Sequence, residues 1–280
     1  MICAGIDAGS RATKAVLFDT EQARVIGRGI ADQGIAQERL ASELLERVCA
    51  EAQSNRAAVR GIVATGYGRN AVRFADTTIT EITCHARGVF HLAPAARTIV
   101  EIGGQDSKCI TLEDGGHVRD FSMNDRCAAG SGRFLEMVAG RLGVDLSALG
   151  ELSRTSRKPA SISSMCVVFA ETEIIGLLAE GMLAADIAAG VQSAIALRVA
   201  ALAGRAIAPP VCFTGGVALQ AGMIRALESA FGCAVQVPPL PQYTGALGAA
   251  LLAAQLPRTR SFPSGTRSTS GKTDSEPGVM

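Results

Sequence analysis

Ile6-Asp7-Ala8-Gly9-Ser10-Arg11-Ala12-Thr13-Lys14 joins two apolar runs near the start of the chain. The runs at residues 2–7 and 13–19 predict two strands, and residues 8–11 between them predict a tight turn. Asp7 ends the first strand, and the backbone N–H groups and the hydroxyl of the turn are suited to surround a phosphate. A carboxylate beside a phosphate usually holds Mg²⁺ through water. Taken alone, the stretch is equally compatible with an ordinary hairpin that has a polar tip.

A second part of the chain repeats this pattern 94 residues later, which is the distance from Gly9 to Gly103. The shift also aligns Lys14 with Lys108, so residues 102–108 form a second candidate phosphate hairpin. The remaining aligned pairs are Ile6 with Val100, Thr13 with Ser107, Val16 with Ile110, Phe18 with Leu112 and Asp19 with Glu113. Repetition within one chain indicates two duplicated lobes that face each other across a cleft. Each lobe would offer one loop to a nucleotide.

The rest of the chain alternates between strand-like and helix-like segments, which predicts an α/β protein with a mostly parallel sheet and some antiparallel hairpins. We assign residues 1–96 to the first lobe and residues 97–256, which carry the two cysteines at helix starts, to the second, with the option that its last helix packs back on the first lobe. A helix of small residues at 243–250 is expected to pack tightly at the hinge between the lobes. Residues 257–280 are rich in Pro, Ser, Thr, Gly and Arg, so we predict a disordered tail.

A glycine pair follows a late strand at residues 211–213. Thr214-Gly215-Gly216-Val217-Ala218 has the small residues needed where a backbone passes close to a flat ligand such as adenosine. Gln220, on the next turn or helix, is placed to reach the ribose or the base. A plain strand-to-helix turn uses the same glycines, and that alternative stays open at this point.

Two cysteines are predicted at the starts of helices. Cys127 precedes a run whose apolar residues from Phe134 to Leu142 share one helical face, and Cys166 precedes a similar run. The positive end of a helix dipole favours the thiolate form of a cysteine. A four-iron cluster usually needs four thiolates, so a second copy of the chain across a two-fold axis is the simplest source of the other two. An inert buried pair is an equally good interpretation of the spacing.

Composition excludes several classes of function. The 280 residues carry a formal net charge of +1, which argues against a nucleic-acid or membrane surface as the main partner. The sequence opens on a strand pattern with no secretory leader, and we see no uninterrupted apolar segment of membrane-spanning length. We therefore expect a cytoplasmic protein, in which the eight cysteines are reduced thiols or metal ligands. Cys84-His85 is better interpreted as a loop or helix start than as half of a metal site.

Together, the hairpin at residues 7–10, its partner at 102–106 and the turn at 214–216 resemble the nucleotide cleft of the acetate kinase, sugar kinase, Hsp70 and actin superfamily. That resemblance implies two RNase H-like lobes around a nucleotide cleft. Longer motifs resemble the ATP-dependent activators of 2-hydroxyacyl-CoA dehydratases, and this resemblance covers residues 1–256. The motifs are Ala64-Thr65-Gly66-Tyr67-Gly68-Arg69-Asn70, Asn124-Asp125-Arg126-Cys127-Ala128-Ala129-Gly130-Ser131-Gly132-Arg133-Phe134 and Ile162-Ser163-Ser164-Met165-Cys166.

The activator family implies a homodimer with one [4Fe-4S] cluster at its interface, ligated by Cys127 and Cys166 of both chains. It also implies an ATPase in which MgATP drives one electron from a ferredoxin or flavodoxin to the dehydratase, whose substrate becomes a ketyl radical before water leaves. ATP closing the lobes would change the angle between the cysteine helices.

For the nucleotide site, we predict that Asp7 and Asp106 hold Mg²⁺ and position water, and that Gln105 orients the attacking water. Lys14 is equally well interpreted as a solvated strand residue, and Arg11 departs from the small hydroxyl residue expected after Ser10. The residues predicted to contact the nucleotide are Gly9, Ser10, Arg11, Ala12, Thr13, Lys14, Gly103, Gly104, Gly215, Gly216 and Gln220.

Three alternatives to a dehydratase activator follow from the same residues. One is an ATP-binding subunit of a benzoyl-CoA reductase-type complex, which belongs to the same wider family. Another is a small-molecule kinase of the same fold, in which the cysteines are structural. The last is a non-catalytic interaction module that ATP controls.

Overall fold

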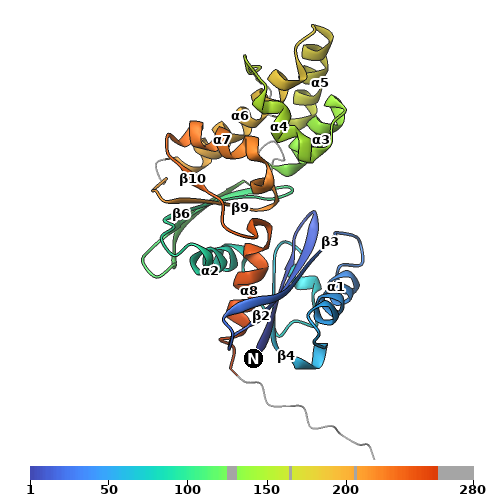
Figure 1. The fold of residues 1–280 in the computed structure, drawn as a ribbon, viewed down its shortest axis with the longest axis vertical. Helices are drawn as coiled ribbons and strands as arrows, with labels where there is room; N and C mark the ends of the chain where they lie inside the picture. Colours follow the sequence, from blue (N-terminus) through green and yellow to red (C-terminus); the bar gives the residue numbers. More distant parts are fainter. Residues whose placement is uncertain (125–130, 164–165, 205–206, 258–280) are drawn as a thin grey trace, which may run out of the picture.

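The computed structural model describes residues 1–124, 131–163, 166–204 and 207–257 of the 280-residue chain. Cys127 and the predicted tail beyond residue 257 lie outside these residues. The described part contains two five-stranded sheets, one above the other in Figure 1. The first sheet contains β1 (Ile2–Ala8), β2 (Ala12–Asp19), β3 (Arg24–Asp32), β4 (Val59–Thr65) and β5 (Thr77–Thr78). The second contains β6 (Thr98–Ile102), β7 (Ser107–Leu112), β8 (Val118–Asn124), β9 (Val211–Thr214) and β10 (Val235–Gln236).

The two sheets have the same strand order. It is β3-β2-β1-β4-β5 in the first sheet and β8-β7-β6-β9-β10 in the second, so each strand has a counterpart. In both sheets an antiparallel hairpin (β1–β2 or β6–β7) leads to a parallel neighbour of its first strand (β4 or β9). The predicted duplicated-lobe fold is confirmed by this topology.

The repeat extends to single hydrogen bonds. The N–H group of Gly9 donates to the carbonyl of Ala12 at 3.2 Å, and the N–H group of Gly103 donates to the carbonyl of Asp106 at 3.0 Å. These positions correspond under the shift that aligns Gly9 with Gly103. The two predicted phosphate hairpins therefore fold into the same kind of turn.

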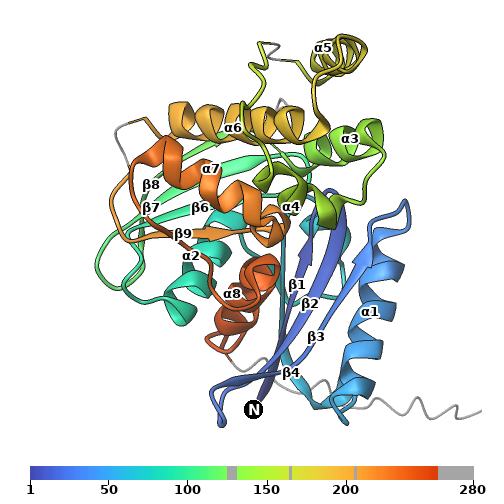
Figure 2. The same cartoon turned by 45° about the horizontal axis from the view of Figure 1, so that its top comes forward.

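Helices cover the sheets in layers, as Figure 2 shows. α1 (Gln37–Glu51) lies on one face of the first sheet, and α8 (Thr244–Ala253) lies on the other. α2 (Glu81–Leu92) covers the facing side of the second sheet, so α2 and α8 lie between the sheets. The outer face of the second sheet carries α3 (Gly132–Leu142), α4 (Leu149–Arg154), α6 (Ala184–Ala203) and α7 (Ala221–Phe231), while α5 (Val167–Ala179) projects beyond them.

Two helices pack on the sheet of the lobe to which the division at residues 96 and 97 does not assign them. Ile82 and Val89 of α2 are buried with Ile99 and Ile110 of the second sheet, although α2 precedes residue 97. The predicted hinge helix, α8, packs its residues near Ala246 against β1, β2 and β4 of the first sheet. The first lobe is thus completed by the distant α8, and the second by α2, which directly precedes its first strand. The division at residues 96 and 97 stays a prediction.

Glycines allow α2 and α8 to cross at close range. A Cβ atom on Gly88 of α2 would clash with the carbonyl oxygen of Thr244, and a Cβ atom on Gly248 of α8 would clash with the carbonyl oxygen of Cys84. The backbone of each helix therefore contacts the backbone of the other. A larger residue at either glycine position would prevent this contact. This crossing joins the two lobes through rigid elements.

Among the described helices, α6 has the length and composition of a membrane span, with a mean hydropathy of 1.4 over its best window. No such segment was expected from the sequence. Its apolar residues Ile187, Val191 and Ile195 are fully buried in the core of the second lobe, and Asp186 lies in its first turn. The helix is therefore explained by packing on the second sheet.

Candidate functional site

A cavity of about 490 Å³ lies between the lobes, within the usual range for small-ligand sites. The β1–β2 turn lines it from the first lobe, while the β6–β7 turn and the turn after β9 line it from the second. The structure brings together the following predicted nucleotide and catalytic residues in its lining: Asp7, Gly9, Ser10, Arg11, Ala12, Lys14, Gly103, Gly104, Gln105, Asp106, Gly215, Gly216 and Gln220.

Thr13 is the predicted contact residue that does not line the cavity. Its side chain is fully buried, and its hydroxyl donates to Oε1 of Gln33 at 3.1 Å. Successive residues of a strand face opposite sides, so Thr13 points away when Lys14 points in. Gln33 in turn donates from Nε2 to the carbonyl of Gly9 at 2.8 Å. Thr13 therefore supports the phosphate turn from behind.

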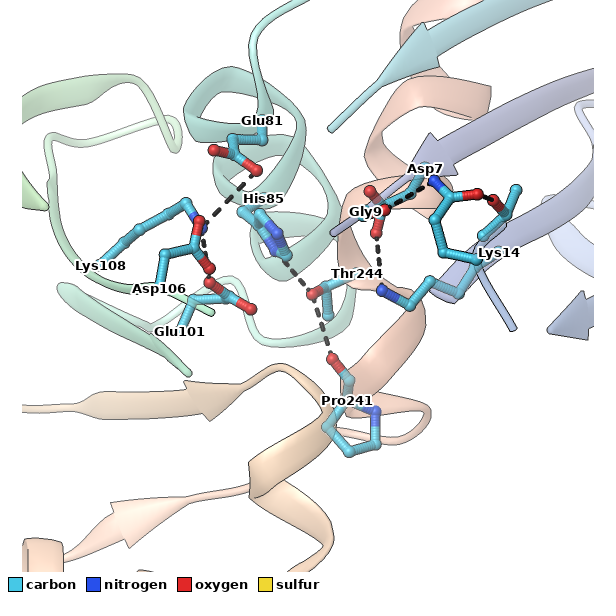
Figure 3. Close-up of polar contacts among 12 residues, drawn as sticks. Asp7, Gly9, Lys14, Glu81, His85, Glu101, Asp106, Lys108, Pro241 and Thr244 are labelled. Atoms are coloured by element: carbon cyan, nitrogen blue, oxygen red, sulfur yellow. Dashed lines mark hydrogen bonds and ion pairs between the residues drawn. The ribbon is translucent and has the colours of Figure 1, made fainter. Parts of the chain in front are cut away.

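An acid and a lysine face each other at equivalent places in the two hairpins (Figure 3). Nζ of Lys14 lies 3.3 Å from Oδ2 of Asp7, and these residues are direct cross-strand partners. In the second hairpin, Nζ of Lys108 lies 2.9 Å from Oε2 of Glu101, again across the strand pair. Lys14 is thus a partner of Asp7 at the cavity wall and is only 18% exposed. Two lysines in one cleft can balance the charge of phosphates.

Lys108 is the centre of a buried charge cluster. The residue is 1% exposed, and its Nζ also contacts Oδ2 of Asp106 at 2.7 Å and Oε2 of Glu81 at 3.6 Å. Burial alone would lower the pKa of Lys108, but Glu101, Asp106 and Glu81 together raise it, so the ammonium stays charged. Burial and the charge of Glu101 raise the pKa of Asp106. Burial also raises the pKa of Glu81 to about 7 despite the opposing effect of Lys108.

His85 connects α2 to the start of α8. Its Nδ1 lies 2.9 Å from the hydroxyl of Thr244, which itself donates to the carbonyl of Pro241 at 3.2 Å. Since the hydroxyl has one hydrogen, Nδ1 must donate, which leaves the lone pair on Nε2. Burial and the charge of Lys108 lower the pKa of His85 to about 4. A neutral imidazole therefore lies in the wall of the cavity.

Sequence reasoning missed four of these lining residues as functional groups: Glu81, His85, Glu101 and Lys108. The repeat contains a signal for two of them, because its shift aligns Lys14 with Lys108 and also Asp7 with Glu101. Glu81 and His85 carry no comparable signal, since they reach the cavity only through the placement of α2. Cys84 and His85 do lie in α2, as the preferred interpretation held.

The residues present suit a magnesium nucleotide. Asp7 and Asp106 come from opposite lobes, and Mg²⁺ is commonly bound by one or two carboxylates, waters and phosphates. In the described ranges no group of three His, Cys, Asp or Glu side chains is arranged to hold a metal directly. The side-chain Oε1 of Gln220 is buried without a hydrogen-bond partner in the described residues. This oxygen is therefore suited to accept a hydrogen bond from a bound ligand.

The turn after β9 needs its first glycine. Gly215 has a φ of 89°, and a Cβ atom there would clash with the carbonyl of Ile102. This turn thereby lies against the strand that leads into the second phosphate hairpin. A flat ligand group in the cavity can approach the backbone here.

Cys166 is the exposed thiol among the cysteines that the structure describes, and it is the residue immediately before α5. Burial raises the pKa of Cys84 and Cys212 to about 12 and that of Cys109 to about 11, so these thiols are poor metal ligands. Cys166 is therefore more accessible to a metal than these buried thiols. The predicted second ligand, Cys127, lies outside the described residues.

Comparisons with known proteins agree with these features. The chain is 43% identical to the activator of lactoyl-CoA dehydratase from Anaerotignum propionicum, over 90% of this chain and 97% of the relative. It is 34% identical to one of the subunits of benzoyl-CoA reductase from Thauera aromatica, over 89% of this chain and 92% of that one.

Two solved structures share the fold along nearly the whole chain. One is the activator of the 2-hydroxyisocaproyl-CoA dehydratase from Clostridium difficile with bound ADPNP, with a TM-score of 0.86 and 41% identity, covering 91% of this chain and 95% of that one. The other is the Acidaminococcus fermentans (R)-2-hydroxyglutaryl-CoA dehydratase component A, with a TM-score of 0.87 and 40% identity, covering 91% and 98%. The family profile of the BadF/BadG/BcrA/BcrD ATPases matches residues 4–253, and the chain belongs to this ATPase family.

Proposed function

We propose that this ATPase is a one-electron donor that activates a 2-hydroxyacyl-CoA dehydratase in the cytoplasm. It receives the electron from a ferredoxin or flavodoxin and works as a homodimer that shares one [4Fe-4S] cluster. Relatives that are 43% and 41% identical to it are named as activators of such dehydratases. The observation that carries the proposal is the exposed Cys166 at the start of a projecting helix, on a chain whose lobes enclose a nucleotide-sized cavity.

In the ATPase step, the turn amides and Lys14 bind the phosphates, and Asp7 and Asp106 hold Mg²⁺ through water. Gln105 orients a water molecule whose oxygen attacks the γ-phosphorus while the bond to the β–γ bridging oxygen breaks. Glu81 accepts the proton of that water, because its pKa of about 7 leaves a large fraction ionised at neutral pH. ADP and inorganic phosphate are then the products.

In the electron-transfer step, Cys127 and Cys166 of both chains hold the cluster, which supplies a site for one electron. α5 offers the surface for the second chain, because Val168 and Phe169 are 67% and 69% exposed just after Cys166. Large apolar side chains gathered on a projecting element usually mark an interface. Covering them with a second copy would also bring the two Cys166 thiols towards each other.

The proposal is tested by anaerobic purification of the wild-type protein, Cys166→Ser and the matched control Cys233→Ser. Cys233 is a half-buried thiol on the same lobe that the proposal does not use. We expect four irons per two wild-type chains and an EPR signal after reduction by dithionite. Cys166→Ser should lose both while it keeps ATP binding, and Cys233→Ser should keep both. A colourless wild-type protein without iron would contradict the proposal.

A second candidate is an ATP-binding subunit of a benzoyl-CoA reductase-type complex, which the relative from Thauera aromatica supports. Such a subunit stays in a permanent assembly, whereas an activator visits its partner. Gentle purification from the native cells distinguishes them by size. A free homodimer supports the activator, and a stable assembly of four different subunits supports the reductase.

A further inference from the structure

Arg11 joins the two lobes across the cleft. It lies in the β1–β2 turn, and its Nε donates to Oε1 of Glu136 on α3 at 3.1 Å. Its Nη1 donates to Oδ1 of Asp32 on β3 at 3.3 Å. All three side chains line the cavity. Arg11 is 42% and Glu136 is 30% exposed, so water competes for this ion pair and a stronger anion can replace the carboxylate.

α3 is bound to the second phosphate hairpin as well. The N–H groups of Gly132 and Arg133, at the start of the helix, donate to the carbonyls of Gly103 and Gly104 at 2.8 and 2.9 Å. The two phosphate turns also touch each other, because a Cβ atom on Gly104 would lie 2.6 Å from Cβ of Arg11. α3 is thus held by the second turn through its backbone and by the first turn through the side chain of Arg11.

The other end of α3 reaches the helix that follows Cys166. Arg141, in the last turn of α3, forms an ion pair with Glu171 of α5. A change in the position of α3 is therefore passed to α5 by a direct contact. The described contacts run from Arg11 through Glu136 and α3 to the helix that begins after Cys166.

We propose that Arg11 is a positioning residue that acts as a latch between the lobes: it exchanges the carboxylate of Glu136 for a phosphate oxygen when a nucleoside triphosphate binds in the cleft. The single positive charge of Arg11 is shared by two carboxylates, Glu136 and Asp32. A triphosphate adds more negative charge beside them, so it competes for the guanidinium and repels Glu136. The exchange releases α3 from the first lobe, while its bonds to Gly103 and Gly104 remain.

This inference rests on the proposed nucleotide function. It is tested by the direction in which one variant changes the affinity for a nucleotide. Glu136→Gln keeps the shape of the side chain but removes the competing charge, so we expect it to bind a non-hydrolysable ATP analogue about two- to five-fold more tightly, as suits an exposed ion pair. Adenosine, which has no phosphate, should bind the variant and the wild-type protein equally. Glu151→Gln is the matched control, because Glu151 forms an exposed ion pair with Arg154 outside the cavity lining.

Isothermal titration calorimetry measures these affinities, and the Arg11→Gln background separates the latch from a general charge effect. There, Glu136→Gln should no longer change the affinity for the analogue. Hydrogen exchange at residues 132–142 should rise on analogue binding in the wild-type protein, and in Glu136→Gln it should already be high without analogue.

Weaker or unchanged analogue binding by Glu136→Gln would overturn the latch, and so would an effect that persists in Arg11→Gln. Failure of the proposed function looks different, because the wild-type protein would then not bind the ATP analogue at all.

Discussion

Glu81 is a side chain in the cleft whose chemistry is strongly changed by its environment. Burial at the start of α2 raises its pKa to about 7, although Lys108 lies 3.6 Å away. A carboxylate with a pKa near the working pH is suited to accept a proton in the reaction and to release it afterwards. The neighbouring acids Asp106 and Glu101 contribute to the shift by repulsion.

Replacing Glu81 by Gln should lower kcat for ATP hydrolysis by roughly 100-fold or more, the usual loss when a general base is removed. The wild-type rate should rise with pH and level off above about pH 7, and this dependence should be absent in Glu81→Gln. A phosphate-release assay between about pH 5.5 and 8.5 spans this titration and measures both effects, with the exposed Glu43→Gln as control.

The raised pKa of Glu81 also makes the stability of the fold depend on pH in a defined direction. Because the folded protein binds the Glu81 proton more tightly than the unfolded chain, this group destabilises the fold increasingly as pH rises from about 4.5 to about 7. Glu81→Gln should therefore raise Tm at about pH 8 but not at about pH 4. An equal Tm for both proteins at the higher pH would show that burial of the charged carboxylate does not destabilise the fold.

Much of the cleft was visible in the sequence because its residues are local. Asp7, Gly9 and Lys14 stand within one hairpin, and strand alternation decides that Lys14 faces the cavity. The same alternation turns Thr13 away, which the motif alone did not indicate. Glu81 and His85 reach the cavity only because α2 packs against the second sheet, and no short-range pattern encodes that placement.

The crossing of α2 and α8 is the element on which the relation between the lobes depends. The small residues of α8 predicted a tightly packed helix, but they did not identify its partner, since Gly88 lies inside an ordinary helical pattern of α2. Backbone contact on both sides means that the crossing resists bending at this point. Motion between the lobes must therefore pivot about the crossing.

Gly248→Ala should destabilise the protein by about 2 kcal/mol, because the new methyl group clashes with the carbonyl of Cys84 and forces the helices apart. Gly140→Ala, in the open part of α3, is the control. No described atom would contact its new methyl group, so the higher helix propensity of alanine should stabilise the protein by up to about 1 kcal/mol. Urea unfolding curves measure both changes, and equal effects would exclude the close contact.

At the scale of the whole molecule, duplication was predictable from the sequence, but the packing of α2 on the second lobe was not. The shift of Gly9 onto Gly103 predicted two copies of one hairpin, and the sheets confirm it with a common strand order. The alternating pattern does not show that α2 covers the second sheet although the predicted division places it in the first lobe. Which of two sheets a helix covers depends on tertiary packing, which local periodicity does not record.

Assembly is expected to depend on the exposed apolar side chains of α5. Phe169→Glu places a charge where the proposed second chain would bury an aromatic ring, so we expect the homodimer to become a monomer. Ile35→Glu is the control, since Ile35 is fully exposed on the first lobe. Size-exclusion chromatography with light scattering, without oxygen, measures the mass. A Phe169→Glu dimer would place the interface elsewhere.

The packing of α8 against β1 also bears on how the chain is made. β1 is synthesised long before α8, the helix that covers one face of its sheet and ends at Ala253. Until α8 has been made, the side chains of Val16 and Phe18 lack the helix that buries them in the folded protein. The nascent first lobe therefore stays incomplete until α8 has been made, and its uncovered apolar face is exposed to aggregation until then.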